Sequence, residues 1–250
     1  MRERDLVGRQ NHFIAEGEVV LRVLLSGRHS PVCLLLAEKR LASLQPLLAG
    51  LDDSVPVYSA DQSVMDGIVG FPLHRGILAL GRRAPLPDAA DLLSACPAPA
   101  LVVVLCGIAN HDNMGGLFRN AAAFGAHAVL LDAQCCDPLY RKAIRVSVGG
   151  SLTVPFARVD PAVDIPDLLA QNGFSAFALS PAGATPLAKV RRPERAALLF
   201  GAEGPGLPAA LLAGTQTVSI PMASGFDSLN VATTSGIVLY HFTAATTLPA

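Results

Sequence analysis

The chain has 250 residues, of which 51% are hydrophobic and 16% charged, so it can bury one large core or two modest ones. Its formal net charge of -1 at pH 7 excludes a global basic field, although a local basic patch can still meet a polyanion. No apolar run approaches the roughly 20 residues of a membrane span, and the start has no apolar stretch typical of a signal peptide. We therefore expect no membrane contact and a cytoplasmic location.

Residues 1–83 are predicted to form a small α/β domain. A helical period runs over 11–27, and apolar runs indicate further elements. These are strands over 31–38, 55–60 and 74–83 and a helix over 39–51. Arginines such as Arg75 lie near the ends of these elements, where they suit phosphate contacts as well as ordinary solvated faces.

Residues 84–99 read as a linker, because four prolines surround a short helical pattern. The predicted second domain is 100–250, in which apolar runs alternate with helical patterns. The predicted strands are 101–108, 127–132, 152–156, 174–180, 196–203 and 217–222. The predicted helices are 115–125, 165–173, 207–214 and 228–242. This alternation is typical of an α/β fold with a parallel sheet covered on both faces.

Polar side chains follow several of these strands, and in parallel sheets ligands bind beyond the carboxyl ends. The residues are Asn110, Ser180, Glu203 and Ser228. No G-x-G-x-x-G follows the first strand, and the chain has no P-loop and no G-x-S-x-G elbow. What remains is a site of amides, one acid, one arginine and glycine-rich backbone.

Five cysteines form no C-x-x-C pair, and no H-x-x-x-H pair occurs, which argues against a disulfide framework and a metal site. The cysteines are Cys33, Cys96, Cys106, Cys135 and Cys136. We expect reduced thiols and no metal.

Each candidate site residue also has a purely structural interpretation. The Glu203 loop could be a surface turn, since glycine and proline mark turns. Arg119 could be an ordinary helix-surface arginine. Asp227, Ser228 and Asn230 could do no more than cap the final helix.

Three stretches taken together resemble the three ordered motifs of the SpoU/TrmH branch of the SPOUT methyltransferases. They are "NHDNMGGLFRNAAAFGAHAVLL", "LLFGAEGPGL" and "IPMASGFDSLNVATTSGIVLY". The resemblance covers residues 100–242. It implies transfer of a methyl group from S-adenosylmethionine to a ribose 2'-oxygen of RNA, and a SPOUT domain with a trefoil knot. No pattern of residues predicts the knot, because knotted chains are rare.

The resemblance also implies roles for individual residues. The catalytic set is Asn110 and Arg119 from the first motif, Glu203 from the second, and Ser228 and Asn230 from the third. The cofactor set is Ser180, Gly201, Ile220, Met222 and Leu229. Asn120 departs from the threonine or serine that commonly follows the arginine, and Ala202 stands where asparagine is frequent.

RNA contacts are expected outside this site. The stretch "DPLYRKAIRVSVGG" resembles a family segment between the first two motifs, which makes Arg141, Lys142 and Arg145 candidates for phosphate contacts, together with Arg75. The segment 1–83 resembles the small RNA-binding domain of ribosomal-RNA members, through "FIAEGEVVLRVL" and "HRGILAL", which favours ribosomal over transfer RNA. The family further implies a homodimer.

The implied chemistry needs alignment more than acid-base catalysis. A guanidinium is effectively always protonated, so Arg119 is expected to stabilise the developing alkoxide rather than to abstract a proton. Three alternatives stay open: a non-catalytic RNA-binding protein on the same fold, a transfer-RNA ribose methyltransferase, and base methylation by a related knotted enzyme. The sequence does not identify the RNA, the nucleotide or its base.

Overall fold

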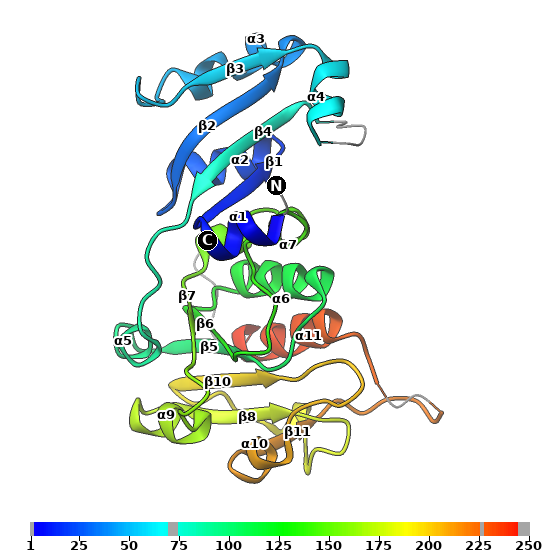
Figure 1. Ribbon diagram of the computed structural model, residues 1–250. Coiled ribbons are helices and arrows are strands. Elements are labelled where there is room, and N and C mark those ends of the chain that lie inside the picture. The colour runs from blue at the N-terminus through cyan, green and yellow to red at the C-terminus, as the bar shows by residue number, and fades with distance from the viewer. Residues whose placement is uncertain (1–2, 70–74, 226–227, 245–250) are drawn as a thin grey trace. The chain divides into compact units, whose positions relative to one another are not determined.

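The computed structural model describes residues 3–69, 75–225 and 228–244, and the chain divides into two compact units (Figure 1). The first unit is Met1–Pro85 with Asp137–Thr153, and the second is Leu86–Cys136 with Val154–Ala250. This division differs from the expected one in two places. Residues 137–153 belong to the first unit, and most of the expected linker belongs to the second.

The first unit contains a four-stranded sheet in the order β1-β4-β2-β3. Its strands are β1 His12–Glu16, β2 Ser30–Ala37, β3 Val57–Ala60 and β4 Ile77–Arg82. Strand β4 runs antiparallel to both β1 and β2, whereas β3 pairs parallel with β2. Its helices are α1 Glu3–Arg9, α2 Glu18–Ser26, α3 Glu38–Leu48, α4 Gln62–Val69, α7 Arg141–Val146 and α8 Gly150–Thr153.

The helix predicted over 11–27 is wrong in its first part. Residues 12–16 form β1, with buried and partly buried side chains alternating over its first residues, and α2 begins only at Glu18. Gly17 separates them with φ 91, and its N–H donates to the carbonyl of Ile77 at 3.0 Å. Apolar spacing alone did not reveal this break, because a left-handed residue interrupts the period without changing the composition. His74, at the start of the predicted strand 74–83, lies outside the described residues.

Residues 137–153 are held in the first unit by buried ion pairs. Arg141 Nη1 lies 3.0 Å from an oxygen of Glu16, a carboxylate of β1 that is only 6% exposed. Arg83 pairs with Asp137 in the same way. A carboxylate buried this deeply requires a partner, so the segment completes the unit that contains Glu16.

The second unit is built on a seven-stranded sheet in the order β7-β6-β5-β10-β8-β11-β9, and every neighbouring pair is parallel. The strands are β5 Ala100–Leu105, β6 Ala128–Leu131, β7 Phe156–Arg158, β8 Ser175–Leu179, β9 Thr185–Pro186, β10 Arg195–Phe200 and β11 Gln216–Ser219. All six residues of β5 are buried, as both faces of a covered parallel sheet require. The predicted fold class is confirmed.

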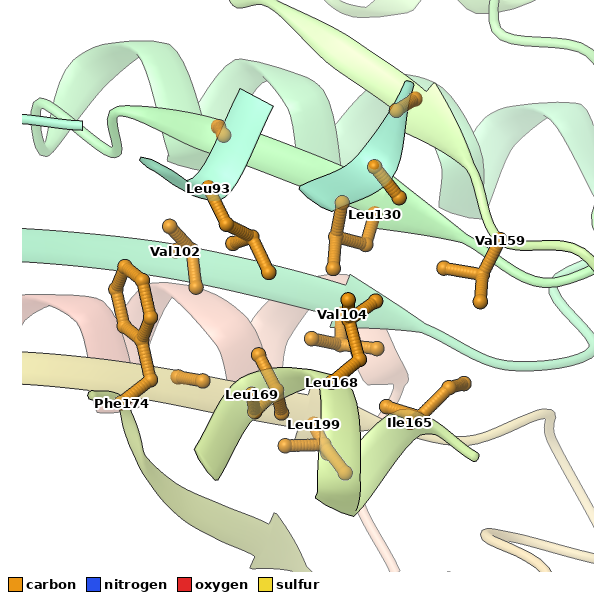
Figure 2. Packing of buried hydrophobic residues seen from close by; sticks show 14 of the residues in the cluster. Leu93, Val102, Val104, Leu130, Val159, Ile165, Leu168, Leu169, Phe174 and Leu199 are labelled. Carbon is orange, nitrogen blue, oxygen red and sulfur yellow. The ribbon is translucent and has the colours of Figure 1, made fainter. Parts of the chain in front are cut away.

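Helices cover both faces of this sheet. Helices α5 Ala89–Ser94 and α9 Ile165–Gln171 pack on one face, where Leu93 and Leu168 lie over Val102 and Val104 (Figure 2). Leu93 is fully buried, so residues 89–94 of the expected linker are part of a core. Helix α10 Ala209–Ala213 and a short 3-10 turn, Leu187–Lys189, also belong to this unit.

The opposite face carries α6 His111–Ala123 and α11 Val231–Ala244. Phe118 of α6 makes an edge-on contact with Phe156 of β7, and Phe177 of β8 makes one with Phe242 of α11. The two helices touch closely, since a Cβ at Gly116 would lie 2.6 Å from that of Ala232. In the described part of the chain no helix is both long and apolar enough to span a bilayer.

A buried histidine makes the first unit sensitive to acid. His29 is 4% exposed, and its Nδ1 accepts a hydrogen bond from the N–H of Ala84 at 3.1 Å. Burial, with the charges of Arg28 and Arg83, lowers the pKa of His29 from 6.5 to about 4. The folded state therefore holds a neutral imidazole that the unfolded chain protonates below pH 6.5.

We expect the free energy of unfolding of this unit to fall as pH drops from 6.5 towards 4, by about 2 kcal/mol between pH 7 and pH 5. Urea titrations at the two pH values measure the difference. His29→Asn keeps an acceptor for Ala84 without the titrating group and should remove most of it. An equal pH dependence in this variant would contradict the assignment.

Candidate functional site

A cavity of about 410 Å³ lies beyond the carboxyl ends of β8, β10 and β11. The chain that follows each of these strands lines it, through residues 179–181 after β8, 200–206 after β10, and 218–222 and 228–234 after β11. This is the edge of a parallel sheet where ligands bind. The cavity thus occupies the position that the sequence pattern predicted.

Eight of the ten residues predicted for catalysis and cofactor binding line this cavity. They are Ser180, Gly201, Glu203, Ile220, Met222, Ser228, Leu229 and Asn230. Asn110 and Arg119 do not line it. Asp227, which the sequence also placed at this helix start, lies outside the described residues.

The loop 201–206 folds back on itself. The N–H of Gly206 donates to the carbonyl of Ala202 at 3.0 Å, and a Cβ at Gly201 would lie 2.3 Å from the carbonyl carbon of Gly206. Gly201 is therefore required by the loop's own backbone. Gly204 and Gly206 have φ 85 and 70, in the left-handed region that favours glycine. The turn leaves Glu203 exposed beside the cavity.

The loop after β8 is equally close to its neighbour. The N–H of Ser180 donates to the carbonyl of Val218, and that of Gly183 donates to the carbonyl of Ser180, both at 3.0 Å. A Cβ at Gly183 would lie 2.3 Å from the carbonyl carbon of Val218. Ser180 is thus fixed between its own turn and β11.

The cavity combines an apolar wall with a few polar groups. The apolar side chains are Leu179, Phe200, Val218, Ile220, Met222, Leu229 and Val231. The polar side chains are Ser180, Glu203, Ser228, Asn230 and Thr234. Such a site suits a ligand with an apolar or planar part that is oriented by few hydrogen bonds. Glu203, the one carboxylate among the described residues that line it, favours a neutral or cationic ligand.

Asn230 joins the three motifs. Its Nδ2 donates to Oδ1 of Asn113 and to Oε1 of Glu203, both at 2.9 Å. Its Oδ1 accepts from the N–H groups of Ala232 and Thr233 and so caps α11. The capping interpretation is therefore true of Asn230, yet the same side chain also binds the other two motifs.

The asparagine of the first motif in this cluster is Asn113 and not Asn110, the residue that the family resemblance implied. Asn110 is exposed, and its Oδ1 accepts from the N–H groups of Asp112 and Asn113 at the start of α6. Asn113 is 8% exposed and faces Asn230. Its place one helical turn after the cap was the available signal, since a residue at this spacing returns to the same face of the helix.

Arg119 lies on α6 beyond Asn113, exposed to solvent. It has no hydrogen-bond or ion-pair partner among the residues that the structure describes. Asn120 instead faces α11, where its Nδ2 donates to the carbonyl of Ala232 and to Oγ of Ser235. The departure from the family pattern at residue 120 therefore supports the packing of α6 against α11.

The predicted RNA-binding residues lie in three different surroundings. Arg75 and Arg145 line a second cavity, which lies within the first unit. Arg141 pairs with the buried Glu16, so this arginine has a structural role. Lys142 is exposed and does not line either cavity.

At the strand ends, the described residues form neither a reactive thiol nor a metal site. Cys106 and Cys135 are buried, and desolvation raises the pKa of Cys106 to about 12 and also raises that of Cys135. Thiols with raised pKa values are poor nucleophiles at neutral pH. Within 3–69, 75–225 and 228–244, no three His, Cys, Asp or Glu side chains gather as a metal site would need.

The fold and the cavity define an α/β domain with a cavity where loops from three parallel strands meet, the position at which such sheets bind ligands. A model of the SpoU rRNA methylase family matches residues 100–240, so the chain belongs to this family of RNA methyltransferases. The family that the three motifs predicted is confirmed.

Relatives and solved structures agree with this assignment. A protein of Mycobacterium bovis named as a tRNA/rRNA methyltransferase is 42% identical, covering 97% of this chain and 84% of its own. The 23S rRNA (guanosine-2'-O-)-methyltransferase RlmB of Ralstonia nicotianae is 30% identical, over 82% of this chain and 84% of its own. The SpoU methyltransferase AviRb of Streptomyces viridochromogenes, solved with the cofactor AdoMet, has a TM-score of 0.84 at 21% identity, covering 98% and 94% of the two chains. That likeness shows the fold.

We expect Asn230→Ala to lower the free energy of unfolding of the second unit by about 1–3 kcal/mol, because it removes a helix cap and two further hydrogen bonds. Asn230→Ser keeps a capping oxygen and should lose less. Urea unfolding of the two variants gives the comparison. Equal losses would mean that the cap contributes nothing to stability, and an unchanged Asn230→Ser would mean that the bonds to Asn113 and Glu203 contribute nothing.

Proposed function

We propose that the protein transfers a methyl group from S-adenosylmethionine to the 2'-hydroxyl of a ribose in RNA, with ribosomal RNA favoured over transfer RNA. The observation that carries this proposal is the hydrogen-bonded cluster of Asn113, Asn230 and Glu203 beside the cavity, in a chain of the SpoU family. It unites residues of all three motifs at one edge of the sheet.

The cavity fits the cofactor. Its wall between residues 201 and 206 is mostly backbone, and no atom lies within 4 Å of where a Cβ at Gly204 or Gly206 would be. Ser180, Gly201, Ile220, Met222 and Leu229 would hold the cofactor there. Bound S-adenosylmethionine supplies a methyl group already activated by its sulfonium.

The polar residues orient the RNA hydroxyl. Asn230 holds the Glu203 carboxylate in place, and Ser228 lies in the same wall. The charge of Arg119 would stabilise the oxygen as it loses its proton, because a guanidinium keeps its own proton in proteins. Asn110 acts through the start of α6, which it caps, and is thus a positioning residue.

Ribose rather than base is favoured by the relative from Ralstonia nicotianae, whose name specifies guanosine-2'-O-methylation of 23S rRNA. The relative from Mycobacterium bovis is named for both tRNA and rRNA. The first unit carries thirteen lysines and arginines against ten aspartates and glutamates and can supply RNA contacts. Its resemblance to the small RNA-binding domain of ribosomal-RNA members favours ribosomal RNA.

We also infer a homodimer whose site is shared. Arg119 is exposed and outside the cavity of its own chain, so a second copy would be needed to bring an arginine to it. Helix α11 presents Ile237 and Tyr240 to solvent, 40% and 63% exposed, next to the exposed alanines of α6. Apolar and small side chains on neighbouring helices suit close packing against another chain.

A trefoil knot is part of the same proposal. The chain passes from β11, near one edge of the sheet, back to α11, which packs against α6 on the β5 side. On the way, residues 220, 222 and 228–230 line the same cavity as the loops after β8 and β10. Three strand-end loops meeting at one site support a threaded crossing.

The function is tested by mass spectrometry of nucleosides from the RNA of cells with and without the gene. One 2'-O-methylated nucleoside should disappear and return with the wild-type gene. Arg119→Ala should fail to restore it, whereas Arg191→Ala, which changes another exposed arginine of the same unit, should succeed. Loss of a base-methylated nucleoside would contradict the ribose assignment, and no loss at all would favour a non-catalytic RNA-binding protein.

The shared site is tested by mixing two inactive variants. Arg119→Ala removes the charge, and Gly201→Val places a side chain where the Gly206 backbone lies, so each homodimer should be inactive. If Arg119 serves the partner's cavity, a heterodimer has one site with both lesions and one intact, and activity partly returns.

Native mass spectrometry must first confirm that heterodimers have formed. Absence of recovery would then show that Arg119 acts within its own chain, while the proposed methyl transfer would stand.

A further inference from the structure

A second cavity, of about 610 Å³, lies entirely within the first unit. Its walls come from the first turns of α2 and α3, the residues around the start of β4, and the end of α7 with the turn that follows it. These segments are far apart in the sequence. None of them belongs to the three motifs.

Four cations and one carboxylate line this cavity: Lys39, Arg40, Arg75, Arg145 and Glu18. Glu18 is already paired, since Arg22 and Arg40 each approach one of its oxygens to 2.8 Å. Lys39, Arg75 and Arg145 are exposed and have no carboxylate partner in the described part of the chain. The cavity therefore holds an excess of positive charge that a bound anion would neutralise.

The side chain of Arg75 is positioned by the backbone at the start of α2. A Cβ at Gly17 would lie 2.8 Å from Cδ of Arg75 and 2.9 Å from its Nη1. Gly17 thus lets the arginine lie across this helix start. Neither α2 nor α3 has a side-chain cap, so the positive ends of both helices add to the field in the cavity.

The same cavity exposes apolar side chains. Val19 is 54% exposed and Val148 is 39% exposed. Val148 also has φ 54, a left-handed conformation that is unfavourable for a β-branched residue and that glycine ordinarily occupies after a helix. Strain of this kind persists where it serves a site, and here it accompanies an apolar group in a basic cavity.

We propose that this cavity binds one unpaired nucleotide of the RNA substrate, remote from the methylated ribose, with Lys39, Arg75 and Arg145 on its phosphates and Val19 and Val148 against its base. The inference rests on the proposed function and names a substrate contact for it. Cations beside an apolar surface match the two parts of a nucleotide. An unpaired nucleotide fits better than a duplex, because its base can leave the stack and enter a cavity.

The test measures binding of a fluorescein-labelled 12-nucleotide oligouridylate to the full chain by fluorescence anisotropy over a range of salt concentrations. Arg75→Gln and Arg145→Gln should each weaken binding about 5- to 10-fold and reduce the slope of log affinity against log salt by about 0.7. Arg82→Gln is the matched control, because Arg82 is an exposed arginine of the same unit outside the cavity. It should leave affinity and slope unchanged.

Val148→Gly separates a base contact from a structural role. Glycine relieves the left-handed strain, so the melting temperature should stay equal or rise, while affinity for the oligouridylate should fall about threefold. Unchanged affinity would overturn the base contact. A lower affinity accompanied by a lower melting temperature would overturn it too, because the residue would then act through folding.

Three results would overturn the proposal as a whole: no binding of the oligouridylate by the wild-type chain, equal affinities in the arginine variants and the control, or displacement of the oligouridylate by polyglutamate as readily as by unlabelled RNA. The last would indicate an acidic peptide instead. Transfer of radiolabelled methyl groups to RNA is measured separately on the wild-type chain. Failure there with intact cavity-dependent binding would remove the proposed function alone, and the reverse pattern would remove this inference alone.

Discussion

The side-chain amide of Asn230 makes hydrogen bonds to three separate parts of the second unit, and the shape of the cavity follows from them. Its nitrogen reaches Asn113 at the start of α6 and Glu203 in the loop after β10, while its oxygen caps α11. These segments follow different strands, so no local turn could hold them together. Around this point apolar side chains form most of the cavity wall, and the glycines of 201–206 allow the backbone to come close to a ligand. Site geometry and helix packing therefore depend on the same few atoms.

Charge is divided unevenly between the units. The first has three more basic than acidic residues, whereas the second has six lysines and arginines against ten aspartates and glutamates. A unit with net negative charge repels phosphate overall. A cationic side chain in it therefore acts either at a particular site or in stabilising the fold. Arg195 and Arg192 are structural, with guanidinium groups that donate to backbone carbonyls. Arg119 has no such partner among the described residues, which distinguishes it from them.

Sequence reasoning predicted the parallel sheet because each strand of a doubly covered sheet is a continuous apolar run, as in Ala100–Leu105. Eight of the residues that it predicted for the site line one cavity, because carboxyl ends of parallel strands share an edge; their roles stay predictions. It could not separate β1 from α2, where one left-handed glycine changes the structure. It named Asn110 from the resemblance of the first motif and did not consider Asn113, whose contact with Asn230 only the packing of α6 against α11 reveals. Residues 137–153 carried no local sign that their ion-pair partners, Arg83 and Glu16, lie 54 and 125 positions earlier in the chain.

Segment 137–153 also imposes an order of synthesis. The first unit lacks the partners of Glu16 until Arg141 has been made, by which time β5, α6 and β6 of the second unit have already emerged. A ribosome therefore cannot release a finished first unit before starting the second, as it does for chains whose domains are continuous. The two units therefore fold during overlapping periods of synthesis. Gene fusion or shuffling at the proline-rich stretch 84–99 would separate Glu16 and Asp137 from their partners, so inheritance of the two units as one gene segment is favoured.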